Sequence, residues 1–163
     1  MAITQQLTLS QTTLLSATTG KLDVYVLPIW QKKLLLPTVA VVEILPASEL
    51  KTTKKNKKVG ILGQVTWEQE PIPVISFETF NGETQASDPQ KIAIMVAATL
   101  GELHYYGLAL QAEPIKTNVK IAEIEDLEQG ATGGMEYLQI RYQNQLCTIP
   151  DLDAVEAYLA KHL

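Results

Sequence analysis

The sequence predicts a mainly β protein in which two similar small barrels pack together, with one short helix at the C-terminal end. Short runs rich in Val, Ile and Thr recur along the chain and favour strands over helices. Short polar stretches separate several of these runs, as hairpin turns would. The 46% apolar content of the 163 residues is ordinary for a folded domain with a sizeable core.

The first half of the chain contains four candidate strands. They are 23–30, 34–45, 59–65 and 71–80. The first two flank a polar Gln-Lys-Lys turn, and the last two flank the acidic stretch TWEQE at 66–70, which predicts Trp67 at the turn. A loop that ends in the lysine-rich run KTTKKNKK at 51–58 separates the two hairpins. This half therefore reads as two consecutive hairpins.

The second half repeats the hairpin pattern. Its candidate strands are 91–100, 105–115, 135–142 and 146–152. Between them, the segment 116–134 indicates a short acidic helix and a glycine-rich loop. The stretch NGETQASDPQ at 81–90 is rich in turn residues, so we expect the junction of the two barrels near these residues.

The two ends of the chain differ in character. The Thr-, Gln- and Ser-rich residues 1–20 predict a poorly ordered tail without the pattern of a secretory signal, which leaves 21–163 as a single domain. At the other end, Leu152, Val155 and Leu159 follow near-helical spacing within 151–163. These residues predict a C-terminal helix that packs one face on the body of the domain.

Composition excludes several classes of function. A net charge of -5 and a pI near 5.0 argue against a general nucleic-acid binder. The most apolar run, 34–45, is too short to cross a membrane and contains both Pro37 and Glu43. Cys147 is the only cysteine, which fits a reducing compartment. We therefore expect a cytoplasmic protein with no nucleic-acid partner and no direct membrane insertion.

No pattern of residues predicts catalysis or a cofactor. His104 and His162 have no second ligand at metal-binding spacing, so we expect no metal site. Cys147 lies in an apolar strand-like run, which favours a core residue over a nucleophile. Glu68 and Glu70 are better explained as a solvated turn than as an acid/base pair. The sequence thus favours a binding protein over an enzyme.

Trp67 and the lysine run at 51–58 each leave two interpretations open. The indole of Trp67 either folds back into its own barrel or contacts a partner, since Trp is enriched at binding hot spots. The lysine run is either a solvated loop or a surface for an acidic partner. A protein partner is favoured by elimination.

The order of these segments resembles the CheW-like domain family over about residues 22–160. The resemblance rests on LLLPTVAVVEIL, then VGILGQVTWEQEPIPVISFETF, and later KIAIMVA, YYGLAL and LCTIPDLDAVEAYL. It implies two intertwined SH3-like five-stranded β-barrels and a non-catalytic adaptor that joins the regulatory domain of a CheA-like histidine kinase to the signalling tip of a chemoreceptor. The patterns Leu-Pro-x-x-Ala-Val and Pro-x-x-Ser-Phe-Glu look most like the ChpC/PilI-type adaptors of type IV pilus chemosensory systems, which control twitching motility.

The resemblance also implies a set of partner-binding residues. They are Val41, Val42, Glu43, Gly63, Val65, Trp67 and Glu68. Family members typically carry Asn-Leu-Arg-Gly where this chain has Thr-Trp-Glu-Gln, so Glu68 replaces an arginine that can face the residue matching Glu43. A like-charge pair would weaken or redirect receptor binding. The competing interpretation is a small-ligand-binding β-barrel protein with its ligand between the barrels.

Overall fold

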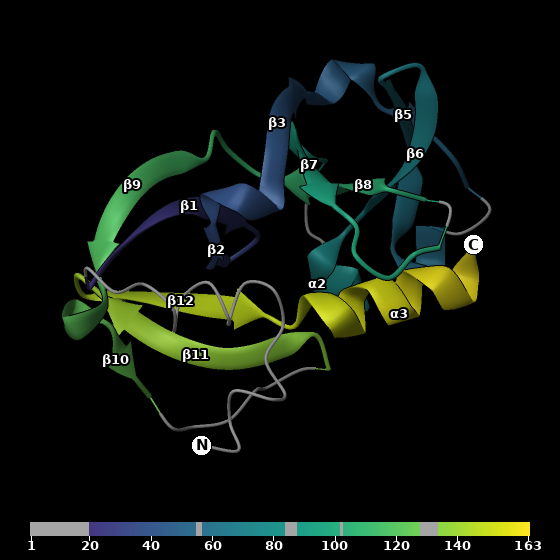
Figure 1. Ribbon diagram of the computed structural model, residues 1–163. Helices are drawn as coiled ribbons and strands as arrows, with labels where there is room; N and C mark the ends of the chain where they lie inside the picture. Colours follow the sequence, from purple (N-terminus) through teal and green to yellow (C-terminus); the bar gives the residue numbers. More distant parts are fainter. Residues whose placement is uncertain (1–19, 55–56, 84–87, 102, 128–133) are drawn as a thin grey trace.

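Two six-stranded sheets form the body of the protein (Figure 1). The computed structural model describes residues 20–54, 57–83, 88–101, 103–127 and 134–163. The first sheet has the order β10 (Glu125–Asp126), β11 (Glu136–Tyr142), β12 (Gln145–Pro150), β2 (Lys32–Pro37), β1 (Lys21–Ile29) and β9 (Ile115–Lys120). The second has the order β3 (Val41–Pro46), β7 (Lys91–Val96), β8 (Tyr105–Leu110), β6 (Glu70–Ile75), β5 (Ile61–Trp67) and β4 (Lys51–Thr52). We call them the first and second barrels.

Three apolar clusters make up the core. The first barrel encloses one around Val24, Leu35 and Ile149, and the second encloses another around Val65 and Ile92. The largest cluster lies between the barrels and takes residues from both of them and from the helices. The mainly β fold is confirmed, although each sheet has six strands where five were expected, because β10 and β4 add two residues each at an edge.

The chain passes between the barrels twice. It leaves the first barrel after β2 through the 3-10 turn η2 (Thr38–Ala40) and returns to it at β9 after completing the second barrel. In the first barrel, β2 pairs in parallel with β12, and Lys33 lies opposite Cys147. The junction predicted near 81–90 is therefore wrong, because β6 and β7, on either side of it, belong to the same sheet. The barrels are intertwined, as the resemblance implied.

Two predicted strands are each interrupted. The run 34–45 divides at Pro37 into β2 and β3, which lie in different sheets. Most of the first half of this run is buried. Apolar residues therefore continue on both sides of Pro37, and the sequence pattern does not show that one strand ends there and another begins. The run 71–80 ends as a strand at Ile75, where Ser76 accepts a hydrogen bond from the amide of Thr79 and caps the helix α2 (Phe77–Phe80).

The segment 116–134, for which the sequence indicates a short acidic helix and a glycine-rich loop, is mainly extended where the structure describes it. It forms β9, the 3-10 turn η5 (Ile121–Glu123) and the short strand β10, and 128–133 lies outside the described residues. The predicted tail at 1–20 also lies outside them, apart from Gly20. In β9, apolar and polar residues alternate only weakly, because it is an edge strand with one fully buried residue, Val119.

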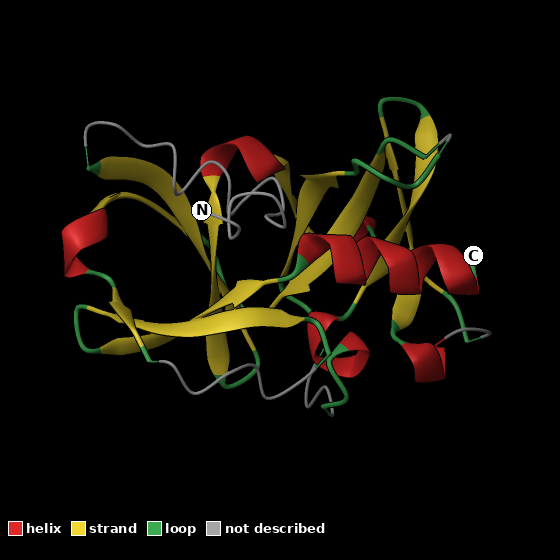
Figure 2. Ribbon diagram, turned by 60° about the horizontal axis from the view of Figure 1, so that its bottom comes forward, coloured by secondary structure: helices red, strands yellow, loops and turns green. Residues whose placement is uncertain are grey.

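The predicted C-terminal helix is confirmed as α3 (Leu152–His162). The side chain of Asp151 caps it by accepting a hydrogen bond from the amide of Ala154. Its buried face includes Val155 and Leu159, and Figure 2 shows the helix lying across one side of the molecule. Of the helices in the described segments, none is long and apolar enough to span a membrane.

Candidate partner-binding surface

Strand β3 presents an exposed edge at the position that the sequence assigned to partner binding. The register of β3 against β7 shifts between Val41 and Glu43, so Val42 is an extra residue at a bulge. Val41 is buried in the core between the barrels, whereas Glu43 is exposed and Val42 keeps 43% of its surface. Val39, just before the strand, is also exposed. The bulge thus turns two consecutive side chains outward where a regular strand would expose one.

Trp67 is the last residue of β5, before the turn, and it packs on its own barrel. Its ring meets that of Tyr105 edge to face, with 4.7 Å between the centroids. Its indole N–H donates a hydrogen bond to the carboxylate of Glu43. The side chain is half-buried against the apolar cluster of the second barrel. The indole therefore packs on its own barrel in part, and contact of its exposed part with a partner stays a prediction.

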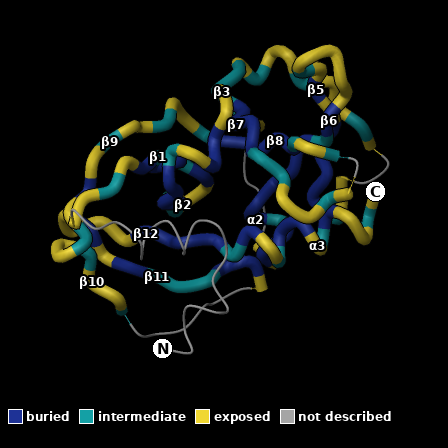
Figure 3. The backbone as a smooth tube through the Cα atoms, viewed as in Figure 1, coloured by how far each residue is buried: buried dark blue, intermediate teal, exposed yellow. Residues whose placement is uncertain are grey.

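The turn after Trp67 consists of Glu68 and Gln69, both of which have left-handed backbones with φ of 52° and 65°. Two consecutive residues with positive φ fit a two-residue hairpin turn, which usually prefers Asn and Gly. Both residues are exposed, as Figure 3 shows for the end of the β5–β6 hairpin. Glu43 therefore accepts a hydrogen bond from within its own barrel, from the indole N–H of Trp67.

Gly63 and Val65 support this surface from inside. Val65 is fully buried in the core of the second barrel, so its side chain cannot touch a partner. At Gly63, a Cβ atom would lie 2.0 Å from the carbonyl oxygen of Lys51 on β4. Glycine is therefore required for β4 to pair closely with β5.

A groove lies beside Gly63 on the outer surface of the second barrel, with a volume of about 610 Å³. It is lined by Lys51, Thr52, Thr53, Ile61, Gly63, Gln64, Pro71, Pro73, Leu103 and Leu163. Strand β4 forms one side, and β5 and β6 contribute residues from the same sheet. The lining mixes apolar side chains with exposed polar ones, which suits contact with a protein surface.

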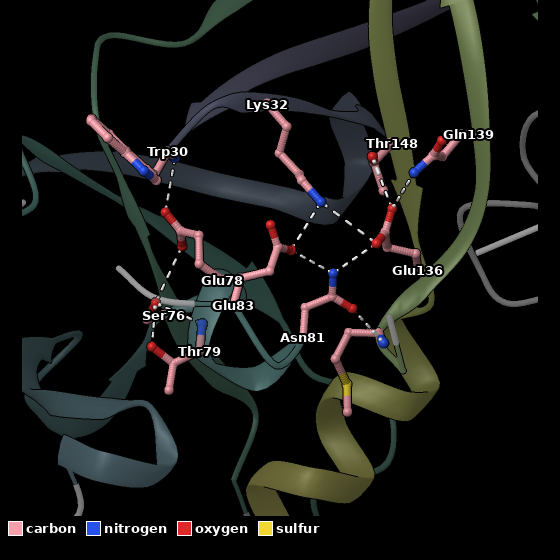
Figure 4. Close-up of polar contacts among 11 residues, drawn as sticks. Trp30, Lys32, Ser76, Glu78, Thr79, Asn81, Glu83, Glu136, Gln139 and Thr148 are labelled. Atoms are coloured by element: carbon pink, nitrogen blue, oxygen red, sulfur yellow. Dashed lines mark hydrogen bonds and ion pairs between the residues drawn. The ribbon is translucent and has the colours of Figure 1, made fainter. Parts of the chain in front are cut away.

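A partly buried polar cluster that the sequence did not reveal links the two barrels (Figure 4). Asn81, just after α2, donates to the carboxylates of Glu83 and Glu136 at 2.7 Å each and accepts from the amide of Met135 at 2.9 Å. The ammonium of Lys32 on β2 lies 2.9 Å from Glu83 and 3.5 Å from Glu136. We call Lys32, Asn81, Glu83 and Glu136 the inter-barrel clamp.

Glu78 makes a second link between the barrels. This buried carboxylate on α2 accepts a hydrogen bond from the backbone N–H of Trp30 at 2.9 Å, at the turn between β1 and β2 (Figure 4). Ser76 donates to its other oxygen at 3.2 Å. Because the helix belongs to the second barrel and the turn to the first, this bond and the clamp hold their relative orientation. The sequence SFETF does not indicate that Glu78 points inward.

Two titratable side chains, those of Cys147 and Tyr106, lie in apolar clusters of the core. Burial raises the pKa of the Cys147 thiol, against a smaller lowering by the charge of Lys33. Burial, reinforced by the charges of Glu156 and Asp153, also raises the pKa of the Tyr106 hydroxyl. Within the described ranges, no group of three or more His, Cys, Asp or Glu side chains could hold a metal ion.

Comparisons with known proteins agree with this architecture. The family model described as the CheW-like domain matches residues 24–157. The scaffolding protein TtCheW from Thermoanaerobacter tengcongensis has a similar structure, with a TM-score of 0.63 and 16% sequence identity over 78% of this chain and 87% of that chain. No curated protein sequence matches this chain significantly. Because the family model covers most of its length, this chain belongs to the CheW-like domain family.

Proposed function

We propose that this protein is a non-catalytic adaptor that couples a CheA-like histidine kinase to chemoreceptors. The match to the CheW-like domain over residues 24–157 is the observation that carries the proposal. The similar structure from Thermoanaerobacter tengcongensis is that of a scaffolding protein, which is the same kind of role. A cytoplasmic location follows from this role.

The receptor tip binds the exposed part of the residues predicted from the sequence. We call Val42, Glu43, Trp67 and Glu68 the partner edge. Its apolar part is Val42 with the outer face of the indole, and its charge comes from the two glutamates. A rim of one charge sign around an apolar centre favours a partner with the opposite charge at matching positions. Val41, Gly63 and Val65 act indirectly, because they keep the strands of this edge in place.

The kinase regulatory domain binds the groove beside Gly63. An adaptor must hold two partners at once, so it needs a second surface that leaves the partner edge accessible. The groove offers apolar contact at Ile61, Pro71 and Pro73 on adjoining strands of one rigid sheet. Rigid surfaces bind with a smaller loss of conformational entropy.

The system served is a type IV pilus chemosensory pathway. This part of the proposal rests on the two short patterns around Pro37 and Ser76 that look like ChpC/PilI-type adaptors. Deletion of the gene in its host should abolish twitching zones on agar, with restoration by the wild-type chain. Normal twitching in the deletion strain would reject this assignment and leave the adaptor role to be tested separately.

Titration calorimetry with the two purified partners tests the adaptor role. We expect micromolar affinity for the kinase regulatory domain. Trp67→Ala should weaken receptor binding, and Glu68→Arg should increase affinity for an ordinary receptor tip about tenfold by restoring the usual charge. Glu123→Arg, an exposed change on the first barrel, is the matched control and should alter neither affinity. Lack of binding to both partners at concentrations of about 100 μM would reject the adaptor role.

A further inference from the structure

A second pocket, of about 370 Å³, lies on the first barrel, away from the partner edge. It is lined by Pro28, Ile29, Gln31, Lys32, Lys33, Gln145 and Leu146. Three strands meet there, because Pro28 on β1 pairs with Lys33 on β2, and Lys33 lies opposite Cys147 on β12. None of these lining residues belongs to the partner edge or to the groove beside Gly63.

The pocket lies over one end of the core of the first barrel. Pro28 follows Val26 by two positions on β1, and Lys33 precedes Leu35 by two on β2. Alternate residues of a strand share a face, and both Val26 and Leu35 belong to the enclosed apolar cluster. Ile29 and Leu146 alternate with these inward-facing positions, and Ile29 packs in the cluster between the barrels. The pocket therefore lies at the end of the first barrel, beside the β1–β2 and β11–β12 turns.

The lining combines an apolar floor with one positive charge that lacks an acidic partner. Leu146 keeps 52% of its surface exposed beside Pro28 and Ile29. The ammonium of Lys32 is occupied by the inter-barrel clamp. Lys33 donates to the neutral side-chain carbonyl of Gln145 at 3.0 Å, and no ion pair involves it within the described part of the chain.

The charge of Lys33 acts toward the barrel interior as well as toward solvent. It lowers the pKa of the Cys147 thiol, against the larger raising effect of burial. An ammonium at the rim of a partly apolar pocket attracts anions more strongly than one surrounded by water, because the effective dielectric constant there is lower. Lys33 therefore places a positive charge beside the apolar residues Pro28, Ile29 and Leu146 of the pocket.

We propose that this pocket binds a small anion with an apolar body, of the class of medium-chain aliphatic carboxylates. The carboxylate accepts a hydrogen bond from Lys33, and the aliphatic chain lies against Pro28, Ile29 and Leu146. The volume lies within the usual range for small-molecule sites. This site is independent of the adaptor role, since it uses a different barrel and none of the proposed partner contacts.

Titration of the full ¹⁵N-labelled chain with sodium octanoate, followed by two-dimensional NMR, tests the site. We expect saturable shifts of the amides of Ile29, Lys33 and Leu146, with a Kd in the low millimolar range, which about ten ligand atoms can supply in an open pocket. Octylamine hydrochloride, with the same chain length and the opposite charge, should produce no saturable shifts. Lys33→Gln should weaken octanoate binding at least about tenfold.

The controls separate a built site from general anion attraction. Lys116→Gln removes an exposed lysine from β9 of the same barrel and should leave the octanoate Kd unchanged. The NMR spectrum of each variant shows directly whether it is folded. Equal responses to octanoate and octylamine, shifts centred on other residues, or retention of full affinity in Lys33→Gln would each overturn the proposal. Tighter binding of an acidic peptide than of octanoate would also overturn it in favour of a protein partner.

Discussion

The contact between Trp67 and Glu43 can be divided into its two components by two substitutions. Trp67→Phe keeps an aromatic ring against Tyr105 but removes the N–H that Glu43 accepts. A hydrogen bond to a charged group contributes about 1.5–3 kcal/mol when buried. Glu43 is exposed and water can replace the donor, so we expect a loss of only about 0.5–1 kcal/mol in the free energy of unfolding.

Trp67→Ala removes the packing as well. The edge-to-face contact with Tyr105 contributes about 0.5–1.5 kcal/mol. Truncation of a fully buried tryptophan costs about 3–5 kcal/mol, and the half-buried position of Trp67 reduces that figure. We therefore expect a total loss of about 2–3 kcal/mol.

Urea unfolding followed by far-ultraviolet circular dichroism measures both losses without relying on tryptophan fluorescence. Combination of Trp67→Phe with Glu43→Ala completes a double-mutant cycle, and the coupling should be about 0.5–1 kcal/mol. Zero coupling would mean that the hydrogen bond contributes nothing. If Trp67→Ala unfolded at the same urea concentration as the wild type, the packing argument would be refuted and Trp67 would serve partner contact alone.

Two further substitutions test the scaffold. Gly63→Ala should lower stability by more than about 3 kcal/mol or prevent folding, because its Cβ would lie 2.0 Å from a β4 carbonyl oxygen, whereas Gly82→Ala meets no atom within 4 Å and should cost about 1 kcal/mol through its positive φ. Stability of Gly63→Ala close to that of the wild type would contradict the tight pairing of β4 with β5. Asn81→Ala should cost about 2–4 kcal/mol by leaving Glu136 and a buried amide with fewer partners, while Asn118→Ala, which breaks an exposed bond to Asp23, should change urea unfolding by under about 0.5 kcal/mol. Equal effects of the two asparagine changes would argue against the clamp.

Much of the fold could be predicted from the sequence, because its signals are local. The β1–β2, β5–β6, β7–β8 and β11–β12 hairpins alternate or cluster apolar residues between polar turns. The helix α3 combines an N-cap at Asp151 with apolar residues at helical spacing. These features depend on neighbouring residues, so a single sequence contains the information that specifies them.

Most of the errors have a common physical cause, since they concern contacts between distant segments. The chain passes between the barrels at Thr38–Ala40, directly after a largely buried strand. The apolar residues of that strand run on into β3, so the sequence predicted one long strand. Strand β9 is specified mainly by its pairing with β1 and therefore carried little local signal. The inward direction of Glu78 and Asn81 depends on partners in the other barrel.

The candidate site stays a prediction from the resemblance and the turn pattern. Three of its proposed members, Val42, Glu43 and Glu68, are exposed, as contact residues must be. The bond between Glu43 and Trp67 joins β3 to the end of β5, and strand periodicity does not predict such a contact. The structure thus adds a hydrogen bond to Glu43 that the sequence analysis did not predict.

The passage of the chain between barrels also determines an order of assembly during synthesis. The second barrel is built from one continuous stretch, Val41 to Leu110. All its strands therefore emerge from the ribosome before β9 emerges. Strands β1 and β2 emerge first, but β2 pairs with β12 more than a hundred residues later. Until then this hairpin has an unpaired edge, which is a site for wrong pairing in a crowded cell. Strand β2, among the first strands to be translated, is therefore among the last to gain all of its native partners.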